Sequence, residues 1–144
     1  MAAVAIVLLA LLAVAWVLEN QVAPAPPAGS PSAYRVRVTR QGRELAAYDI
    51  AALQAIGMKK VVVQGGSEEG PPLLDVLRKA GVTKFDSLTL LGMGQRDGGR
   101  LELSVSDVGP ETVLDIAKRG TVKVAGPSIP REKRVRDLTE IQVN

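Results

Sequence analysis

The sequence contains no cysteine and no histidine, and it is poor in aromatic residues. Its 144 residues include one tryptophan, one phenylalanine and two tyrosines. Without the two missing residue types there can be no disulfides, thiolate nucleophiles or imidazole acid–base chemistry. Zinc sites of the usual nitrogen and sulfur type and haem ligation by histidine or cysteine are excluded as well. Carboxylates remain possible ligands for a hard cation, and methionine remains a possible weak metal ligand.

A dense basic stripe is also lacking. The formal net charge is only +3 at pH 7, and the lysines and arginines are spread over residues 35–136. Few aromatic side chains are available to stack on bases, so we expect no nucleic-acid partner. A mildly basic domain of this kind is attracted weakly to an anionic membrane surface.

One long apolar run, residues 2–18, carries no charge. As a helix it would span about 25 Å, near the lower limit for a bilayer core of about 30 Å. Trp16 lies close to its end, where an aromatic ring favours the membrane interface. We expect residues 1–18 to be one transmembrane helix, acting as an anchor or uncleaved signal. A cleaved signal peptide is the competing interpretation, whereas a buried helix disagrees with a run that is apolar on every face.

The segment that follows, residues 19–33, is rich in proline and alanine and predicts an extended linker. Residues 34–144 then have the size of one domain. Because Arg35 and Arg37 follow the apolar run and no basic side chain precedes it, the positive-inside rule alone would place this domain in the cytoplasm.

Within residues 34–144, short strand-like segments dominate. They alternate apolar and polar residues or consist of apolar, often β-branched runs. The expected strands are residues 34–39, 43–45, 60–64, 85–91, 100–105, 121–125 and 139–143. Glycine-containing turns at residues 41–42 and 97–99 predict that two pairs of these strands form hairpins.

Two helices are expected between these strands. Asp49 is a suitable N-cap for a helix that ends at Gly57, and Pro71 and Gly81 bracket the second helix. We expect residues 65–70, between the third strand and this helix, to form a loop. Residues 111–119 carry helix signals at both ends, yet their centre also fits a strand. The pattern predicts a mixed, β-rich α+β domain.

Three local patterns resemble the molybdopterin-binding domain of sulfite-oxidase-type oxidoreductases. The first is the run GPPLLDVLRKAGV at residues 70–82. The second is the expected hairpin of residues 85–105, and the third is the closing strand, loop and strand of residues 121–143. Their order and spacing extend the resemblance over residues 34–143, which implies that family's fold.

The family ligates molybdenum through a cysteine that follows a strand, and the matching position here falls in Gln64, Gly65, Gly66 and Ser67. The resemblance therefore implies a shortened, non-catalytic relative without a cofactor. The alternative is a molybdopterin-dependent oxidoreductase with an unusual ligand such as Ser67. Because members of the family often work outside the cytoplasm, the resemblance also favours an extracytoplasmic domain.

Two further features are candidate sites for an anion. Backbone N–H groups of the glycine-rich segment at Gln64–Ser67 can cradle an anion, and Arg96 in the turn of the expected hairpin could contact one. The densest basic group, Arg131, Lys133, Arg134 and Arg136, is expected to be a solvated loop with nearby counter-charges or a contact for lipid headgroups or an acidic partner.

The sequence thus favours a membrane-anchored, single-pass protein whose domain binds a small anionic ligand or a protein partner without catalysis. An oxidoreductase is the alternative function, and an accessory subunit of a larger membrane complex is a third.

Overall fold

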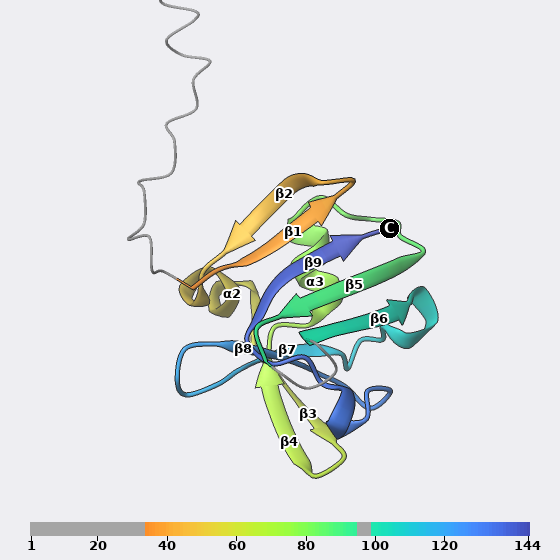
Figure 1. Cartoon of the computed structure of the whole chain (residues 1–144). Coiled ribbons are helices and arrows are strands. Elements are labelled where there is room, and N and C mark those ends of the chain that lie inside the picture. The colour runs from red at the N-terminus through yellow and green to blue at the C-terminus, as the bar shows by residue number, and fades with distance from the viewer. Residues whose placement is uncertain (1–33, 95–98) are drawn as a thin grey trace, which may run out of the picture. The chain divides into compact units, whose positions relative to one another are not determined.

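The computed structural model describes residues 34–94 and 99–144 of the chain. Residues Tyr34–Asn144 form one compact unit, a mixed, β-rich α+β domain (Figure 1). The strands are β1 Val36–Arg40, β2 Arg43–Tyr48, β3 Lys59–Val63, β4 Gly66–Gly70, β5 Ser87–Gly92, β6 Arg100–Ser104, β7 Val113–Ile116, β8 Val122–Ala125 and β9 Leu138–Val143. The helices are α2 Ile50–Ile56 and α3 Leu73–Lys79, with short 3-10 turns η2 Val105–Asp107 and η3 Arg131–Lys133.

Five strands form the principal sheet, in the order β2-β1-β9-β5-β6. The first and last of the described strands, β1 and β9, pair in parallel, with Val38 opposite Ile141. All other neighbours in this sheet are antiparallel, including the expected hairpins β1–β2 and β5–β6. The last strand therefore lies in the middle of the sheet and joins the two hairpins.

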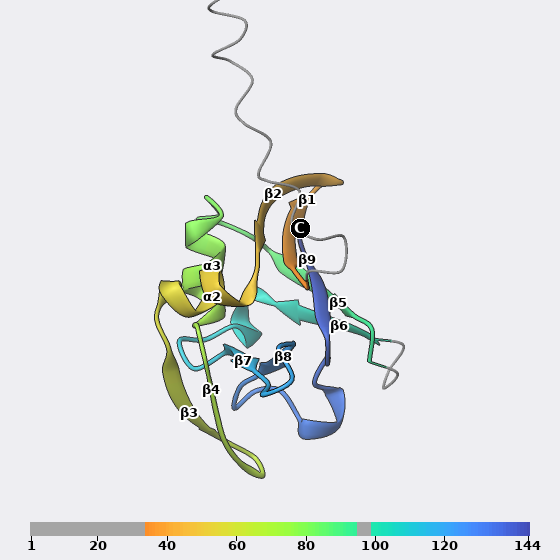
Figure 2. The same ribbon diagram turned by 90° about the vertical axis from the view of Figure 1, so that its left-hand side faces the viewer.

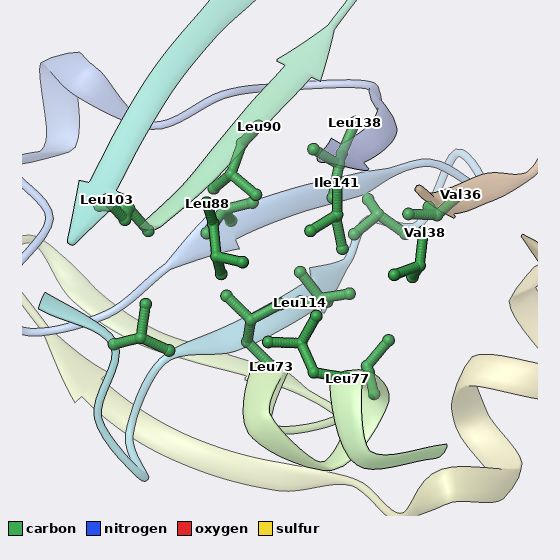
Figure 3. Packing of buried hydrophobic residues seen from close by; sticks show 14 of the residues in the cluster. Val36, Val38, Leu73, Leu77, Leu88, Leu90, Leu103, Leu114, Leu138 and Ile141 are labelled. Carbon is green, nitrogen blue, oxygen red and sulfur yellow. The ribbon is translucent and has the colours of Figure 1, made fainter. Parts of the chain in front are cut away.

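One face of this sheet carries the hydrophobic core. Figure 2 shows α2 and α3 together on that side, and Figure 3 shows side chains of β1, β5 and β9 pointing toward α3 and β7. Leu73 and Leu77 of α3 and Leu114 of β7 pack against the sheet with at most 1% of their surface exposed. Burying apolar surface in this way is the main source of stability for a domain without disulfides.

The helices begin and end where the sequence predicts. The Asp49 carboxylate accepts a hydrogen bond from the backbone N–H of Ala52 at 2.7 Å, and Gly57 ends α2. Helix α3 follows Pro72 and buries Leu73, Val76 and Leu77. The backbone N–H of Gly81 closes the end of α3 on the carbonyl of Arg78.

Two segments adopt a secondary structure that their local sequence patterns do not specify. Residues 65–70 were expected to be a loop, but Gly66–Gly70 is strand β4, paired antiparallel with β3. That loop prediction is wrong because pairing to the β-branched residues of β3 outweighs the weak strand propensity of glycine, serine and glutamate. Residues Val113–Ile116 are strand β7, paired with β8, which confirms the strand alternative for the ambiguous segment.

Residues 1–18 and 19–33, for which an anchor and a linker are expected, lie outside the described residues. In the part of the chain that is described, neither helix has the length and apolar character needed to cross a membrane.

Candidate functional site

The candidate residues Gln64, Gly65, Gly66 and Ser67 lie together at the tip of the β3–β4 hairpin, and all four are exposed. Val63 pairs with Gly66, so Gln64 and Gly65 form the two-residue turn. Gly65 has a φ of 91°, a conformation that a side chain at this position would strain. Figures 1 and 2 show the hairpin projecting from the rest of the domain, which makes its tip accessible to a partner.

The hairpin is held to the domain by a small apolar cluster of its own. Val61 and Val63 on one face of β3 are buried with Val113 of β7 and Ala125 of β8. Val62, on the opposite face, is 82% exposed. Because side chains alternate along β3, one face of the strand is buried against the domain and the other faces solvent.

A group of ion pairs lies beneath the tip. Glu68 of β4 accepts hydrogen bonds at Oε1 from Lys123 Nζ at 2.8 Å and from an Arg134 guanidinium nitrogen at 3.0 Å. Lys123 is also 3.5 Å from a carboxylate oxygen of Asp115, whose other oxygen accepts from the backbone N–H of Glu69. Two cations and two carboxylates from four separate segments thus balance one another.

Arg134 is the buried member of this group, with 4% of its side chain exposed. A second guanidinium nitrogen donates to the backbone carbonyl of Gln64 at 3.0 Å, so this arginine holds both the turn and β4. Its Nε atom is buried without a hydrogen-bond partner among the described residues. A buried ion pair with an unmet donor fixes geometry more than it adds stability.

Arg131 lies against the tip from the outside. A Cβ on Gly65 would be 3.5 Å from a guanidinium nitrogen of Arg131, and this arginine is exposed. No ion pair involves Arg131 within residues 34–94 and 99–144. Its charge is therefore available next to the exposed glycine backbone.

The structure brings together two features that are far apart in the sequence, the glycine-rich turn and part of the basic group at residues 131–136. Arg134 donates a hydrogen bond to the turn and Arg131 lies beside Gly65, while Lys133 and Arg136 are exposed elsewhere on the loop. The expectation of a uniformly solvated basic loop is wrong for Arg134, because β4 supplies its counter-charge. Arg96, the other candidate, lies outside the described residues.

Lys123 and Asp115 were not singled out in the sequence. The only available signal was strand periodicity, since Lys123 stands between the buried residues Val122 and Val124 of β8 and must face the other way. Which residue it would meet there depends on the approach of β4 to β7, and that approach is a tertiary feature.

The donor set does not fit a molybdenum site. Ser67 is exposed on the projecting hairpin, and the nearest carboxylate, Glu68, is already paired with two cations. Among the described residues no group of three or more histidine, cysteine, aspartate or glutamate side chains is close enough to share a metal ion. The arrangement offers positive charge and exposed backbone, which are suited to holding an anion.

No protein-family model matches the chain, and no curated protein matches it significantly.

Proposed function

We propose that residues 34–144 are a non-catalytic binding module that residues 1–18 tether to a membrane and that recognises a negatively charged ligand or protein partner at the β3–β4 tip. The observation that carries the proposal is the placement of Arg131 beside Gly65, at a turn held in place by Arg134. A fixed turn with an exposed arginine loses little conformational freedom when it binds.

The sulfite-oxidase-like fold is part of this proposal. It is supported by the three sequence patterns at residues 70–82, 85–105 and 121–143 and by the strands and helix found within them. The molybdopterin-dependent alternative has the same support, but exposed Ser67 with already paired neighbours is a poor replacement for a thiolate ligand. We therefore derive no reaction step through that cofactor.

The membrane tether rests on the apolar run and the linker, and we place the domain outside the cytoplasm. Because the chain has no cysteine, the Ser67→Cys variant would carry a single thiol at an exposed position. An impermeant maleimide added to intact cells of the native host should label it. Protection of this thiol until the cells are lysed would place the domain on the cytoplasmic side.

Binding at the tip can be tested with a photoreactive amino acid in place of Ser67 of the full chain in native membranes. We expect an adduct whose yield falls when Arg131→Gln is added and is unchanged by Lys84→Gln, which removes one charge from another exposed position. No adduct, or an adduct that does not depend on Arg131, contradicts recognition at the tip.

The non-catalytic part is tested separately on the wild-type chain purified from its native host. We expect neither molybdenum nor pterin fluorescence. One molybdenum atom per chain together with pterin fluorescence would overturn this part and favour the oxidoreductase.

A further inference from the structure

We propose that a second site, which shares Lys123 with the ion pairs beneath the hairpin tip, binds the phosphate group of a small molecule or of a lipid headgroup. The site is a surface hollow of about 380 Å³ between the β7–β8 turn and the segment before β9. We call it the basic hollow, and its polar lining residues are Lys118, Arg119, Thr121, Lys123, Arg136 and Asp137. This proposal goes beyond the function proposed above, because it does not require the tip.

The first wall of the basic hollow is a closed turn. The backbone N–H of Ala117 donates to the carbonyl of Thr121 at 2.8 Å, and that of Gly120 donates to the carbonyl of Ala117 at 2.9 Å. The turn presents Lys118 and Arg119 at its exposed corner. Lysine and arginine at such a corner keep their charged groups in solvent, where a ligand can reach them.

The second wall is fixed to the principal sheet. The carbonyl of Arg136 accepts from the backbone N–H of Gly94 at 3.2 Å, and the carbonyl of Asp137 accepts from that of Met93 at 3.1 Å. A side chain at Gly92 would collide with the carbonyl of Arg136, so the two segments are in close contact. The backbone of Arg136 is therefore fixed by its contacts with residues 92–94 at the end of β5.

Two contacts connect the walls. Arg119 donates to Thr121 Oγ1 at 2.9 Å and to Asp137 Oδ1 at 2.5 Å, which joins the turn to the segment before β9. At the starts of β8 and β9, the Tyr34 hydroxyl accepts from the backbone N–H of Val122 at 3.0 Å and donates to the carbonyl of Leu138. The hollow is thus formed before any ligand arrives.

The lining has an excess of positive charge. Among the described residues that line the hollow there are four cations, and Asp137 is the one carboxylate. Asp137 is paired with Arg119, and Lys123 is paired with Glu68 and Asp115. Among the described residues neither Lys118 nor Arg136 forms an ion pair, so these two cations lie at the same hollow without a counter-charge.

A phosphate monoester matches this lining better than a carboxylate does. It carries about −1.5 to −2 charge at pH 7 and three strong acceptor oxygens, and it can therefore meet lysine and arginine donors from both walls at once. The volume of about 380 Å³ lies in the usual range of about 300–1,000 Å³ for small-molecule sites and leaves room for the group that the phosphate is attached to.

The experiment measures binding of inorganic pyrophosphate to the full chain in phosphatidylcholine nanodiscs by calorimetry. The test variant is Lys118→Gln/Arg136→Gln, and the matched control is Arg43→Gln/Lys84→Gln, which removes the same charge from exposed positions that do not line the hollow. We expect the test variant to raise the Kd about tenfold or more and the control to change it less than threefold. All four positions are exposed, so thermal melting should confirm that both variants fold.

Failure of wild-type binding at millimolar pyrophosphate, or an equal loss in the control variant, would overturn the proposal. The Lys118→Gln/Arg136→Gln variant should keep the Arg131-dependent adduct at the tip, which separates this site from the tip. Changing the lipid of the nanodisc tests whether the phosphate group belongs to a lipid headgroup or to a soluble molecule. If phosphatidic acid in the nanodisc weakens pyrophosphate binding more than phosphatidylserine does, the hollow takes a lipid headgroup, whereas equal effects favour a soluble phosphate ester.

Discussion

At the scale of single residues, Gly70 shows how the absence of a side chain allows strands β4 and β7 to pack closely. It ends β4, and a Cβ there would collide with the backbone carbonyl of Leu114 in β7. The close approach places Glu69 where its backbone N–H can reach Asp115 and keeps Leu114 fully buried. Since the obstacle is backbone and not the end of a flexible side chain, it cannot move aside cheaply.

We therefore predict that Gly70→Ala lowers the free energy of unfolding by about 2 kcal/mol or more through steric strain. Gly109→Ala is the matched control, because a Cβ there meets no atom within 4 Å. It should change stability by less than about 1 kcal/mol. Urea denaturation of both variants measures the difference, and equal values would show that β4 and β7 can separate without cost.

At the scale of elements, the β3–β4 hairpin shows where sequence reasoning succeeds and where it stops. The β-branched run predicted a strand at residues 60–64, and the glycines predicted a loop at residues 65–70, whereas the structure ends β3 at Val63 and places the turn at Gln64 and Gly65. Strand β4 was missed, because GSEEG has little intrinsic strand propensity and becomes a strand only against its neighbours. In the same way, residues 113–116 carry the end signals of a helix, but pairing with β8 makes them a strand.

The candidate site was predictable only in parts. The glycine-rich segment at Gln64–Ser67 and the basic group containing Arg131 and Arg134 were each visible as local patterns. Their contact was not, because 66 residues of sequence separate Glu68 from Arg134 and no local rule joins them. Long-range ion pairs of this kind depend on the packing of β4 on β7, which sequence periodicity does not specify.

The ion pairs beneath the hairpin provide the prediction for this scale. Glu68→Gln leaves the buried Arg134 and the partly buried Lys123 without their shared carboxylate, and it should lower the free energy of unfolding by about 1–3 kcal/mol. Glu69→Gln makes the same chemical change at the exposed neighbouring position and should have an effect of about 0.5 kcal/mol or less. Chemical denaturation measures the free energy of unfolding of both variants. If Glu68→Gln lowers it no more than Glu69→Gln does, the ion pairs are too exposed to solvent to stabilise the domain.

At the scale of the whole domain, Tyr34, the first described residue, contacts the starts of β8 and β9, the last two of the described strands. Its hydroxyl bridges β8 and β9, and burial raises the pKa of Tyr34 to about 12 from its ordinary value of 10.0. Burial also raises the pKa of Tyr48, whose hydroxyl donates to the carbonyl of Val76 at 3.4 Å. The protonated phenol is thus the form that the fold requires at both tyrosines.

The sign of the pH dependence follows directly. Between pH 10 and pH 12 the unfolded chain has lost the Tyr34 proton and the folded chain retains it, so the stability contributed by this group is complete below pH 10 and is lost as the pH rises through 12. In the Tyr48→Phe variant, Tyr34 is the remaining tyrosine, and its phenolate absorbance should appear near pH 12. Unfolding of Tyr34→Phe should depend less steeply on pH in this window than unfolding of the wild type. Phenolate absorbance near pH 10 in the folded Tyr48→Phe protein would contradict the bridge.

The central place of β9 has a consequence for how the domain is made. Strand β9 joins the β1–β2 and β5–β6 hairpins, and it is the last of the described strands (Figure 1). During synthesis from the N-terminus, the two hairpins therefore cannot pair into one sheet until Leu138–Val143 has been made. The order of the strands therefore keeps the principal sheet open until Leu138–Val143 has been synthesised.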